Sequence, residues 1–506
     1  MDLPENPNAP GLKFKPEFSA YRLKSGEVAL LSERQSLVLS GPEYTALEPL
    51  LDGSRNADAL ANNLSDRFPP ERVYYALARL QARGVLETGE RPTPAPTDIG
   101  IDGTAAPVKC STPPHVHVYT ATVRQSLASR RASGVLVRPL TVAGWGRTET
   151  EALTRCLSEV AERRAGLVAD NSTCIHACFD ELDGRAVTPG DLTMFSLDQY
   201  AGRENYNARN TGPDRKPGQS DPAERIDWVA TRSMQDRQQV WLPATYCYYA
   251  HARPTGSVFC IADSSGCAAG VTMSDAVVRG FLELVERDAC AIWWYNRLRR
   301  PEFDLKSSID PFFVATREAM REHGRTLKVF DLTHDLGIPV IAAVSWRASD
   351  MKGLRLGLGA RFDRYGAITQ ALGELNQLVF ANDETTACDR VPDHLCDAAS
   401  EPCMPLGESG MPYHKEDSSF LEYCVKLLRQ RGLEMLVLDQ SEPQVQSRVA
   451  RVVVPGLRST SARFAPGRLF EVPVALGWRK EPGTQAELES APAFPGRQID
   501  GPSAPN

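Results

Sequence analysis

The sequence has no long apolar run and no strong excess of either charge. Apolar stretches stay well below the roughly 18 residues that a membrane-spanning helix needs, and the start, MDLPENPNAP, lacks the basic and apolar segments of a secretory signal. The 57 basic and 64 acidic residues give a net charge of −7, which argues against a nucleic-acid-binding surface. We therefore expect a cytoplasmic protein whose partners are neither membranes nor nucleic acids.

Cysteines are few and do not form a disulfide framework. The 12 cysteines are scattered over 506 residues, which is typical of free thiols in a reducing compartment. Two groups of cysteines close to a histidine leave zinc binding open, although neither has two cysteine pairs at ordinary zinc spacing. These groups are Cys174, His176 and Cys178, and Cys388, His394, Cys396 and Cys403. We favour structural thiols at these positions over zinc ligands.

Proline is concentrated in segments that divide the chain. It recurs in residues 1–16, in RPTPAPTDIGIDGTAAPVKCSTPP at 91–114, and in the tail APAFPGRQIDGPSAPN. Because proline removes a backbone donor and fixes φ, these segments are expected to be flexible or linking. The expected domains are a small one at 14–90 and a large one at 115–485, joined by the linker 91–114 and followed by a flexible tail at 486–506.

The small domain has the element order of a winged helix-turn-helix. Short β-type runs at 18–31 and 36–39 precede three segments with helical periodicity, at 43–51, 56–68 and 71–83. The last of these helices has few arginines and no basic run beside it, so DNA binding is not expected. A structural or dimerisation module is the alternative to a peptide-binding function.

The large domain contains two copies of one acidic helical motif. In each copy, two glutamates and an arginine are spaced i, i+3 and i+4, on one face of a helix whose other face is largely apolar. The copies are Glu159, Glu162 and Arg163, and Glu283, Glu286 and Arg287. Carboxylates one turn apart repel each other unless the face is solvated or a cation lies between them. Because the pattern occurs twice, we expect the glutamates to hold Mg²⁺ together with phosphates, and the arginines to meet phosphate oxygens.

A third helix is expected at 365–381, where Gln370, Glu374 and Gln377 share one face and add a carboxylate and two amides. The chain has no G-x-x-x-x-G-K-[ST] motif, so an ATP site here is not a P-loop. β-rich runs at 327–332 and 338–346 alternate with helical segments. This alternation predicts an α/β (α+β) fold class for the large domain.

These motifs resemble those of the YcaO family. Its signatures S-x-x-x-E-x-x-E-R, E-x-x-E-R-D-A followed by W-W/Y, and Q/R-x-x-x-E occur here in family order, and DSSGCAAGVTMSDAVVRG and VVVPGLRSTSARFAPGRLFEVPVALGW also match. The resemblance implies the YcaO fold, ATP and Mg²⁺ as cofactors, and ATP-dependent cyclodehydration of Cys, Ser or Thr to thiazoline or oxazoline in a ribosomal precursor peptide. Thioamide or amidine formation and a non-catalytic peptide-delivery scaffold are the alternatives.

By the same resemblance, the site residues take separate roles. Mg²⁺ is assigned to Glu159, Glu162, Glu283 and Glu286, and the nucleotide to Arg163, Arg287, Gln370 and Glu374. The chain departs from the family by having Arg155 at the serine position of the first signature and Trp145 where many members have lysine. We expect Arg155 and Arg147 to supply the replaced positive charge. The tail also continues past the prolines with which azole-forming members often end.

The small domain resembles the PqqD-like peptide-recognition elements through the run ERQSLVLSGPEYTALEPLLDGSRNADALANNLSDRF. In those elements a leader peptide adds a strand to the sheet and packs against the third helix. The residues that this implies are Ser36 and Val38 on the receiving strand and Val73, Leu77 and Leu80 on the helix. The implied partner is the leader of a precursor peptide, with a partner subunit, a flavin dehydrogenase or a second copy of the chain as further candidates.

Overall fold

The computed structural model describes residues 11–15, 18–22, 27–31, 36–39, 41–82, 85–87, 106–125, 139–167, 174–209, 216–249, 251, 259–260, 262–381, 391–396, 420–442, 447–492 and 494–495. The chain divides into two compact units, residues 1–101 with 414–420, and residues 102–413 with 421–506. Each unit is described by itself.

The smaller unit is an antiparallel sheet followed by three helices, as predicted. β2 (Ser19–Arg22), β3 (Val28–Leu31) and β4 (Ser36–Leu39) pair in the order β2-β3-β4, so β4 is an edge strand among the described strands. The helices are α1 (Pro42–Leu47), α2 (Ala57–Asn63) and α3 (Pro70–Ala82), and β1 (Lys13–Phe14) pairs with β5 (Leu86–Glu87). Asn56 caps α2 by accepting the N–H of Ala59, and α3 begins with a proline, whose missing N–H costs no helical hydrogen bond there.

Three sheets form the framework of the larger unit. β6 (Val108–Lys109), β7 (His117–Val123) and β8 (Leu140–Gly146) make one antiparallel sheet, and β14 (Arg325–Asp331), β15 (Val340–Arg347) and β16 (Arg355–Ala360) make another. The third sheet has the order β10-β12-β11-β17-β18-β13, and β9 pairs with β11. Its strands are β9 (Cys174–Ala177), β10 (Arg185–Ala186), β11 (Ile226–Ser233), β12 (Gln239–Pro243), β13 (Cys267–Gly270), β17 (Leu436–Asp439) and β18 (Arg448–Val453).

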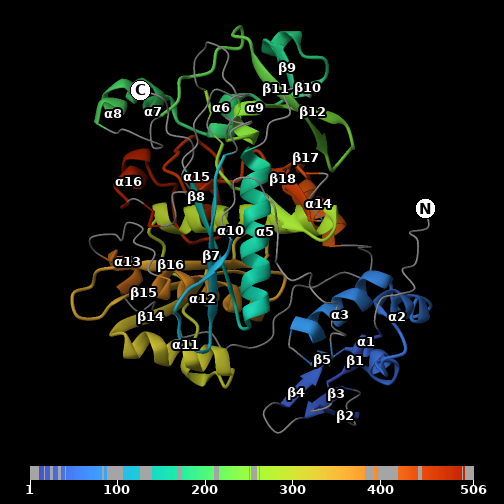
Figure 1. Ribbon diagram of the computed structural model, residues 1–506. Coiled ribbons are helices and arrows are strands. Elements are labelled where there is room, and N and C mark those ends of the chain that lie inside the picture. The colour runs from blue at the N-terminus through green and yellow to red at the C-terminus, as the bar shows by residue number, and fades with distance from the viewer. Residues whose placement is uncertain are drawn as a thin grey trace. The chain divides into compact units, whose positions relative to one another are not determined.

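Three long helices each begin just after a strand and pack back against it. The pairs are β8 with α5 (Glu149–Leu167), β13 with α10 (Met273–Tyr295), and β16 with α12 (Arg364–Phe380); Figure 1 shows α5 running along β7 and β8. Glycines permit this close approach, because a Cβ on Gly144 would lie 2.1 Å from the backbone of Cys156, and one on Gly357 would lie 2.2 Å from that of Ala371. The periodicity of the sequence predicted all three helices.

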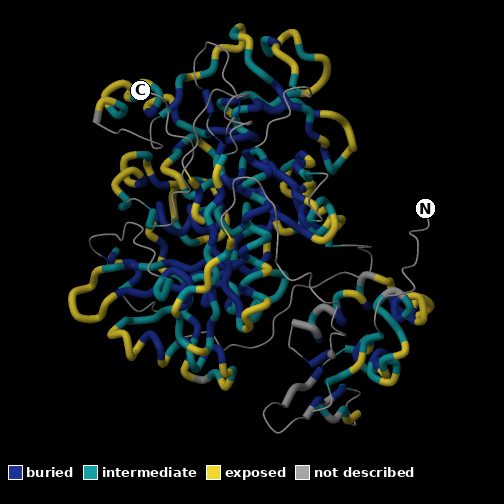
Figure 2. Tube along the Cα trace, viewed as in Figure 1, coloured by how far each residue is buried: buried dark blue, intermediate teal, exposed yellow. Residues whose placement is uncertain are grey.

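The core of the larger unit is centred on α10, whose Phe281, Val285, Trp293 and Trp294 are at most 1% exposed. Figure 2 shows this buried interior beneath an exposed rim of loops and short helices. The remaining helices are α6 (Pro189–Thr193), α7 (Leu197–Ala201), α8 (Arg203–Arg209), α9 (Ala244–Cys247), α11 (Pro311–Glu322), α13 (Asp393–Cys396), α14 (Phe420–Gln430), α15 (Arg468–Ala475) and α16 (Gln485–Glu489). No helix within the described ranges is both long and apolar enough to span a bilayer.

Two segments that were expected to be linking or flexible contain ordered elements. β6 lies inside 91–114, because Val108 and Lys109 pair with β7. The expected tail contains most of α16, and the ring of Phe494 packs edge-on against Trp294 with centroids 5.4 Å apart. Short segments like these are ordered by tertiary contacts that local composition does not reveal. Residues 91–105 and 496–506 lie outside the described residues.

Candidate active site

The carboxylates of α5, α10 and α12 are fixed by the backbones of neighbouring strands and turns. Four glutamates each accept a hydrogen bond from a backbone N–H, which orients one oxygen and leaves the other for a second partner. The bonds are Ala143 N to Glu159 Oε2 (3.0 Å), Ala269 N to Glu162 Oε1 (2.9 Å), Gly266 N to Glu283 Oε2 (2.8 Å) and Leu358 N to Glu374 Oε2 (2.7 Å). Hydrogen bonds of predicted site residues therefore fix the position of each helix relative to a neighbouring strand or turn.

The arginine of each acidic motif forms an ion pair within its own helix. Arg163 Nη2 donates to Glu159 Oε1 at 2.9 Å, and Arg287 Nη2 donates to Glu283 Oε1 at 2.8 Å. Both pairs use the i, i+4 spacing that the sequence predicted. The arginine therefore neutralises the first glutamate of each motif.

The second glutamates, Glu162 and Glu286, resist ionisation. Burial raises the pKa of Glu162 to about 8, against the opposing effects of Arg163 and of the Ala269 N–H, and the charges of Glu159 and Glu283 contribute smaller increases. Burial, and then repulsion from Glu374 and Glu283, raises the pKa of Glu286 to about 8. These mutual effects show that carboxylates from all three helices lie close together.

On α12, the two predicted nucleotide residues face the same cluster. Gln370 Oε1 accepts a hydrogen bond from Arg361 Nη2 at 2.9 Å, and Glu374 lies close enough to raise the pKa of Glu286. The structure therefore brings together all eight residues that were assigned to metal and nucleotide. Their individual roles stay predictions.

The donor set suits Mg²⁺ that is held jointly with phosphate. Within the described ranges, no three His, Cys, Asp or Glu side chains converge as a ready metal site. Mg²⁺ rarely uses a cage of protein ligands, and commonly takes one or two carboxylates together with phosphate oxygens. Glu162 and Glu286, each crowded by other carboxylates, are the groups that such a cation would relieve.

Four arginines lie near one another beside the carboxylates; the sequence pointed to Arg155 and Arg147 but not to Arg361 and Arg279. Burial, together with the nearby charges of Arg361, Arg279 and Arg147, lowers the pKa of Arg155 to about 10, although Glu151 opposes the shift. Arg155 Nη1 is buried without a hydrogen-bond partner in the described part of the chain. Arg361 had a usable signal, since it directly follows β16 at the strand-to-helix junction. Arg155 Nη1, which lacks an acceptor among the described residues, favours an anion such as a triphosphate at this position.

Trp145, at the usual lysine position, belongs to the core. Its side chain is 4% exposed and stacks on Phe312, with ring centroids 5.9 Å apart. The indole lies so close to α12 that a Cβ on Gly373 would be 2.1 Å from it. The Arg155 guanidinium lies 4.1 Å from the centroid of the indole ring, and Arg147 donates to Tyr365 Oη at 3.2 Å. Trp145 therefore contacts the Arg155 guanidinium through the face of its indole ring and does not itself supply charge.

In the smaller unit, the predicted peptide-contact residues lie partly in an edge strand and partly in the core. Ser36 and Val38 lie in the edge strand β4, where Ala29 of β3 is the register partner of Val38. Val73, Leu77 and Leu80 are at most 4% exposed and form part of the core of the unit. The three helix residues therefore fill the interior of the module and do not form a free wall, so the expected leader contact is a prediction for the β4 edge alone.

The cysteine and histidine groups show no metal-site geometry within the described ranges. Cys174, Cys178 and Cys396 form no disulfide with another described cysteine, and His176 Nδ1 pairs with Asp227 at 2.8 Å. Cys388 and Cys403 lie outside the described residues.

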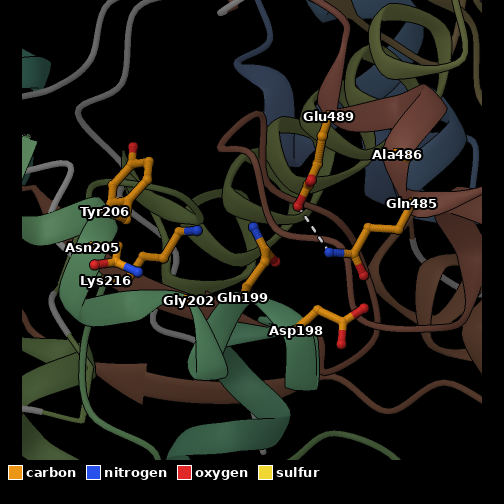
Figure 3. Close-up of a pocket in the computed structure, with 9 residues that line it drawn as sticks. All are labelled: Asp198, Gln199, Gly202, Asn205, Tyr206, Lys216, Gln485, Ala486 and Glu489. Atoms are coloured by element: carbon orange, nitrogen blue, oxygen red, sulfur yellow. Dashed lines mark hydrogen bonds between the residues drawn. The ribbon is translucent and has the colours of Figure 1, made fainter.

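A surface pocket of about 470 Å³ lies between α7, α8 and α16 (Figure 3). It is lined by polar side chains such as Asp198, Lys216 and Glu489, and Gln485 donates to Glu489 across one turn of α16. None of its lining residues comes from α5, α10 or α12, so this pocket is not part of the carboxylate site.

Models of two known domain families match the chain. A model of the YcaO cyclodehydratase family, described as binding ATP and Mg²⁺, matches residues 143–458, and a winged helix-turn-helix domain model matches residues 13–88. An uncharacterized protein of Methanothermobacter thermautotrophicus is 24% identical over 333 residues, which cover 62% of this chain and 81% of that protein. An uncharacterized protein in the tfuA 3′ region of Rhizobium leguminosarum bv. trifolii is 31% identical over 221 residues, or 38% of this chain and 52% of that protein.

Solved structures share the fold. A heterocyclase in complex with substrate and cofactor superposes with a TM-score of 0.69 at 23% identity, covering 96% of this chain and 100% of that one. The heterocyclase TruD gives 0.60 at 23% identity, covering 96% and 99%. YcaO from Methanopyrus kandleri, bound with AMPPCP and Mg²⁺, gives 0.53 at 18% identity, covering 78% and 94%. Since the family model spans more than half of its length, the chain belongs to the YcaO cyclodehydratase family, and its cofactors are ATP and Mg²⁺.

Proposed function

We propose that this chain cyclodehydrates Cys, Ser or Thr residues of a ribosomally made precursor peptide to thiazolines or oxazolines, and that its winged-helix unit binds the leader of that peptide. The observation that carries the proposal is the proximity of carboxylates from α5, α10 and α12, with Arg361 close to Glu286 and the buried Arg155 close to Arg361. Such an arrangement serves phosphoryl transfer, in which placement and charge neutralisation provide most of the catalysis.

In this proposal, the second glutamate of each motif takes up the cation. Glu162 and Glu286 have no arginine of their own motif bonded to them, whereas Glu159 and Glu283 are paired with Arg163 and Arg287. When bound, Mg²⁺ supplies positive charge to the phosphates. Arg361, whose charge lies close to Glu286, and the neighbouring Arg155 neutralise the remaining phosphate charge.

In the proposed reaction, the oxygen lost from the peptide leaves as part of orthophosphate. A side-chain thiol or hydroxyl of the precursor adds to the carbon of the preceding amide and gives its proton to solvent. The former carbonyl oxygen takes the γ-phosphoryl group of ATP, and ADP is released. The C–O bond then breaks as nitrogen forms C=N and releases its proton to solvent. The peptide oxygen therefore leaves in orthophosphate, and the peptide loses one water overall.

Incubation of the full chain with a precursor peptide, ATP and Mg²⁺ tests the proposal. We expect the peptide mass to fall by one water for each orthophosphate released, as followed by mass spectrometry and a phosphate assay. A mass increase corresponding to exchange of oxygen for sulfur would identify thioamide formation instead. Peptide binding with no phosphate release, even with a partner subunit added, would identify a delivery scaffold and overturn the proposal.

A matched pair of variants links the activity to the site. Glu286→Gln keeps the shape of the side chain but removes the charge that Mg²⁺ needs, so we expect peptide-dependent phosphate release to fall at least about a hundredfold, as for loss of several kcal/mol of charge stabilisation. Glu318→Gln, on the exposed side of α11, is the control and should retain the activity of the parent. Equal activity of both variants would remove Glu286 from the proposed metal site.

A further inference from the structure

A second group of arginines lies at the other side of the acidic cluster. A largely enclosed cavity there is lined by Ser265 of the turn before β13, Arg287 of α10, and Arg458 and Arg463 of the segment after β18. Arg287 also pairs with Glu283. Gly266, which follows Ser265, donates its N–H to the same carboxylate. The cavity therefore adjoins the site at which phosphate chemistry is proposed.

Several donors around this cavity have no acceptor. Ser265 is 6% exposed and Arg458 is 4% exposed. Ser265 Oγ, Arg458 Nε and Nη1, and Arg463 Nε are buried without a hydrogen-bond partner in the part of the chain that the structure describes. Buried donors that lack acceptors are costly, and guanidinium donors most of all, so the site lacks a ligand with several acceptor atoms.

Acidic and basic side chains both line the cavity. Asp191 and Asp263 lie there with the three arginines, and Arg451, Arg463 and Arg287 lower the pKa of Asp263 against the opposing effect of burial. Arg451 donates to the backbone oxygens of Asp263 and Tyr246. Arg458 donates from Nη2 to the carbonyls of Ala465 and Pro466, while its Nε and Nη1 have no acceptor among the described residues. An oxyanion supplies several acceptor atoms for such donors.

We propose that Ser265, Arg287, Arg458 and Arg463 form an oxyanion site that receives the orthophosphate released from the peptide. The site rests on the proposed function, because that reaction produces phosphate beside Glu283 and Arg287. As it stands, the cavity of about 20 Å³ holds about one water, so orthophosphate enters when a lining side chain turns. Arg463 is only partly buried and rests over the ring of Phe195 at 5.4 Å, and it is the side chain that we assign to this movement.

Binding of inorganic phosphate to the full chain, measured by calorimetry with saturating ADP and Mg²⁺, tests the site without any peptide. We expect Arg463→Met and Ser265→Ala each to weaken phosphate binding by about tenfold, the factor for losing one charge-assisted or buried hydrogen bond, while the affinity for ADP is unchanged. Arg479→Met, a change of the same size at an arginine outside the cavity, should bind phosphate like the parent. Arg463→Lys, which keeps the charge, should recover part of the affinity.

The outcomes separate this site from the proposed function. Equal phosphate affinity in the parent and both cavity variants overturns the site, as does a parent ADP complex that binds no phosphate although it processes peptide. Weaker binding of ADP and phosphate together in Arg463→Met and Arg463→Lys would indicate a structural role and would also overturn the site. If the parent protein binds phosphate as expected but does not process peptide, the result counts only against the proposed reaction.

Discussion

At the scale of residues, the two side chains that depart from the family signatures, Arg155 and Trp145, contact each other. Arg155 replaces a serine, and its guanidinium lies over the indole of Trp145, which replaces a lysine. The sequence identified both positions as unusual and predicted that Arg155 would restore charge. It could not show that Trp145 is a core residue, because its fit depends on Gly373, which lies more than two hundred positions away on α12.

We expect Arg155→Ala to weaken binding of ATP with Mg²⁺ by at least about tenfold, since a buried guanidinium that meets phosphate contributes on the order of 1.5–3 kcal/mol. Equilibrium titration with a fluorescent ATP analogue measures the change. Thr154→Ala, at the exposed neighbouring position on α5, is the control. ATP affinity in Arg155→Ala equal to that of the parent would show that Arg155 only covers the indole.

At the scale of elements, long helices were predicted well and short elements poorly. α5, α10 and α12 have sustained apolar periodicity, so their existence and the shared face of their acidic residues followed from the sequence. β6 and α16 are short, and they are ordered by β7 and by contacts of the nearby tail such as that of Phe494 with Trp294. The approach of separate helices to form one site was inferred from the repetition of the acidic motif and from the family resemblance, because local periodicity contains no information on it.

A buried histidine that packs against the end of α10 should make the stability of the larger unit depend on pH. His394 of α13 packs edge-on against Trp293 and Trp294, with ring centroids 5.6 and 5.7 Å apart. Burial lowers the pKa of His394 to about 4 from the usual value near 6.5. Because the folded pKa is the lower one, protonation favours the unfolded chain, and stability is full above about pH 6.5 and falls as the pH approaches 4.

Between about pH 7.5 and about pH 5, this histidine alone should lower the free energy of unfolding of the larger unit by about 2 kcal/mol. His394→Phe keeps an aromatic ring between the tryptophans but does not titrate. We therefore expect the loss of stability on acidification, measured by urea unfolding with tryptophan fluorescence, to be about 2 kcal/mol smaller in the variant. The same pH dependence in both proteins would contradict the assignment.

At the scale of the whole molecule, the division into a winged-helix module and a YcaO domain was predicted from proline placement and element order. The position of the linker end was less accurate, because pairing of β6 with β7 extends the larger unit into it. The helix wall of the module was also misplaced, since Val73, Leu77 and Leu80 have the apolar spacing of a core face and fill the core. Spacing alone does not distinguish a buried face from a binding face.

The edge strand gives a direct test of the leader-binding role. Val38→Pro removes a backbone donor from β4, so we expect binding of the precursor leader to weaken by at least about fivefold, the effect of losing one net backbone hydrogen bond. Fluorescence anisotropy with a labelled leader peptide measures this, and circular dichroism checks that the unit remains folded. A Val108→Ala variant, altered in the exposed strand β6 of the larger unit, is the control. Unchanged leader affinity in a folded Val38→Pro protein would count against the β4 edge as the docking strand.

The carboxylates that accept backbone N–H groups belong to helices that touch three separate sheets. Glu159 reaches β8, Glu162 reaches β13 and Glu374 reaches β16, so a cation and nucleotide held among them act as a cross-link within the domain. Binding to the folded chain alone adds its free energy to that of folding. The melting temperature of this domain should therefore rise with nucleotide occupancy. A melting curve recorded without ATP and Mg²⁺ describes a less stable protein than the one that binds its peptide.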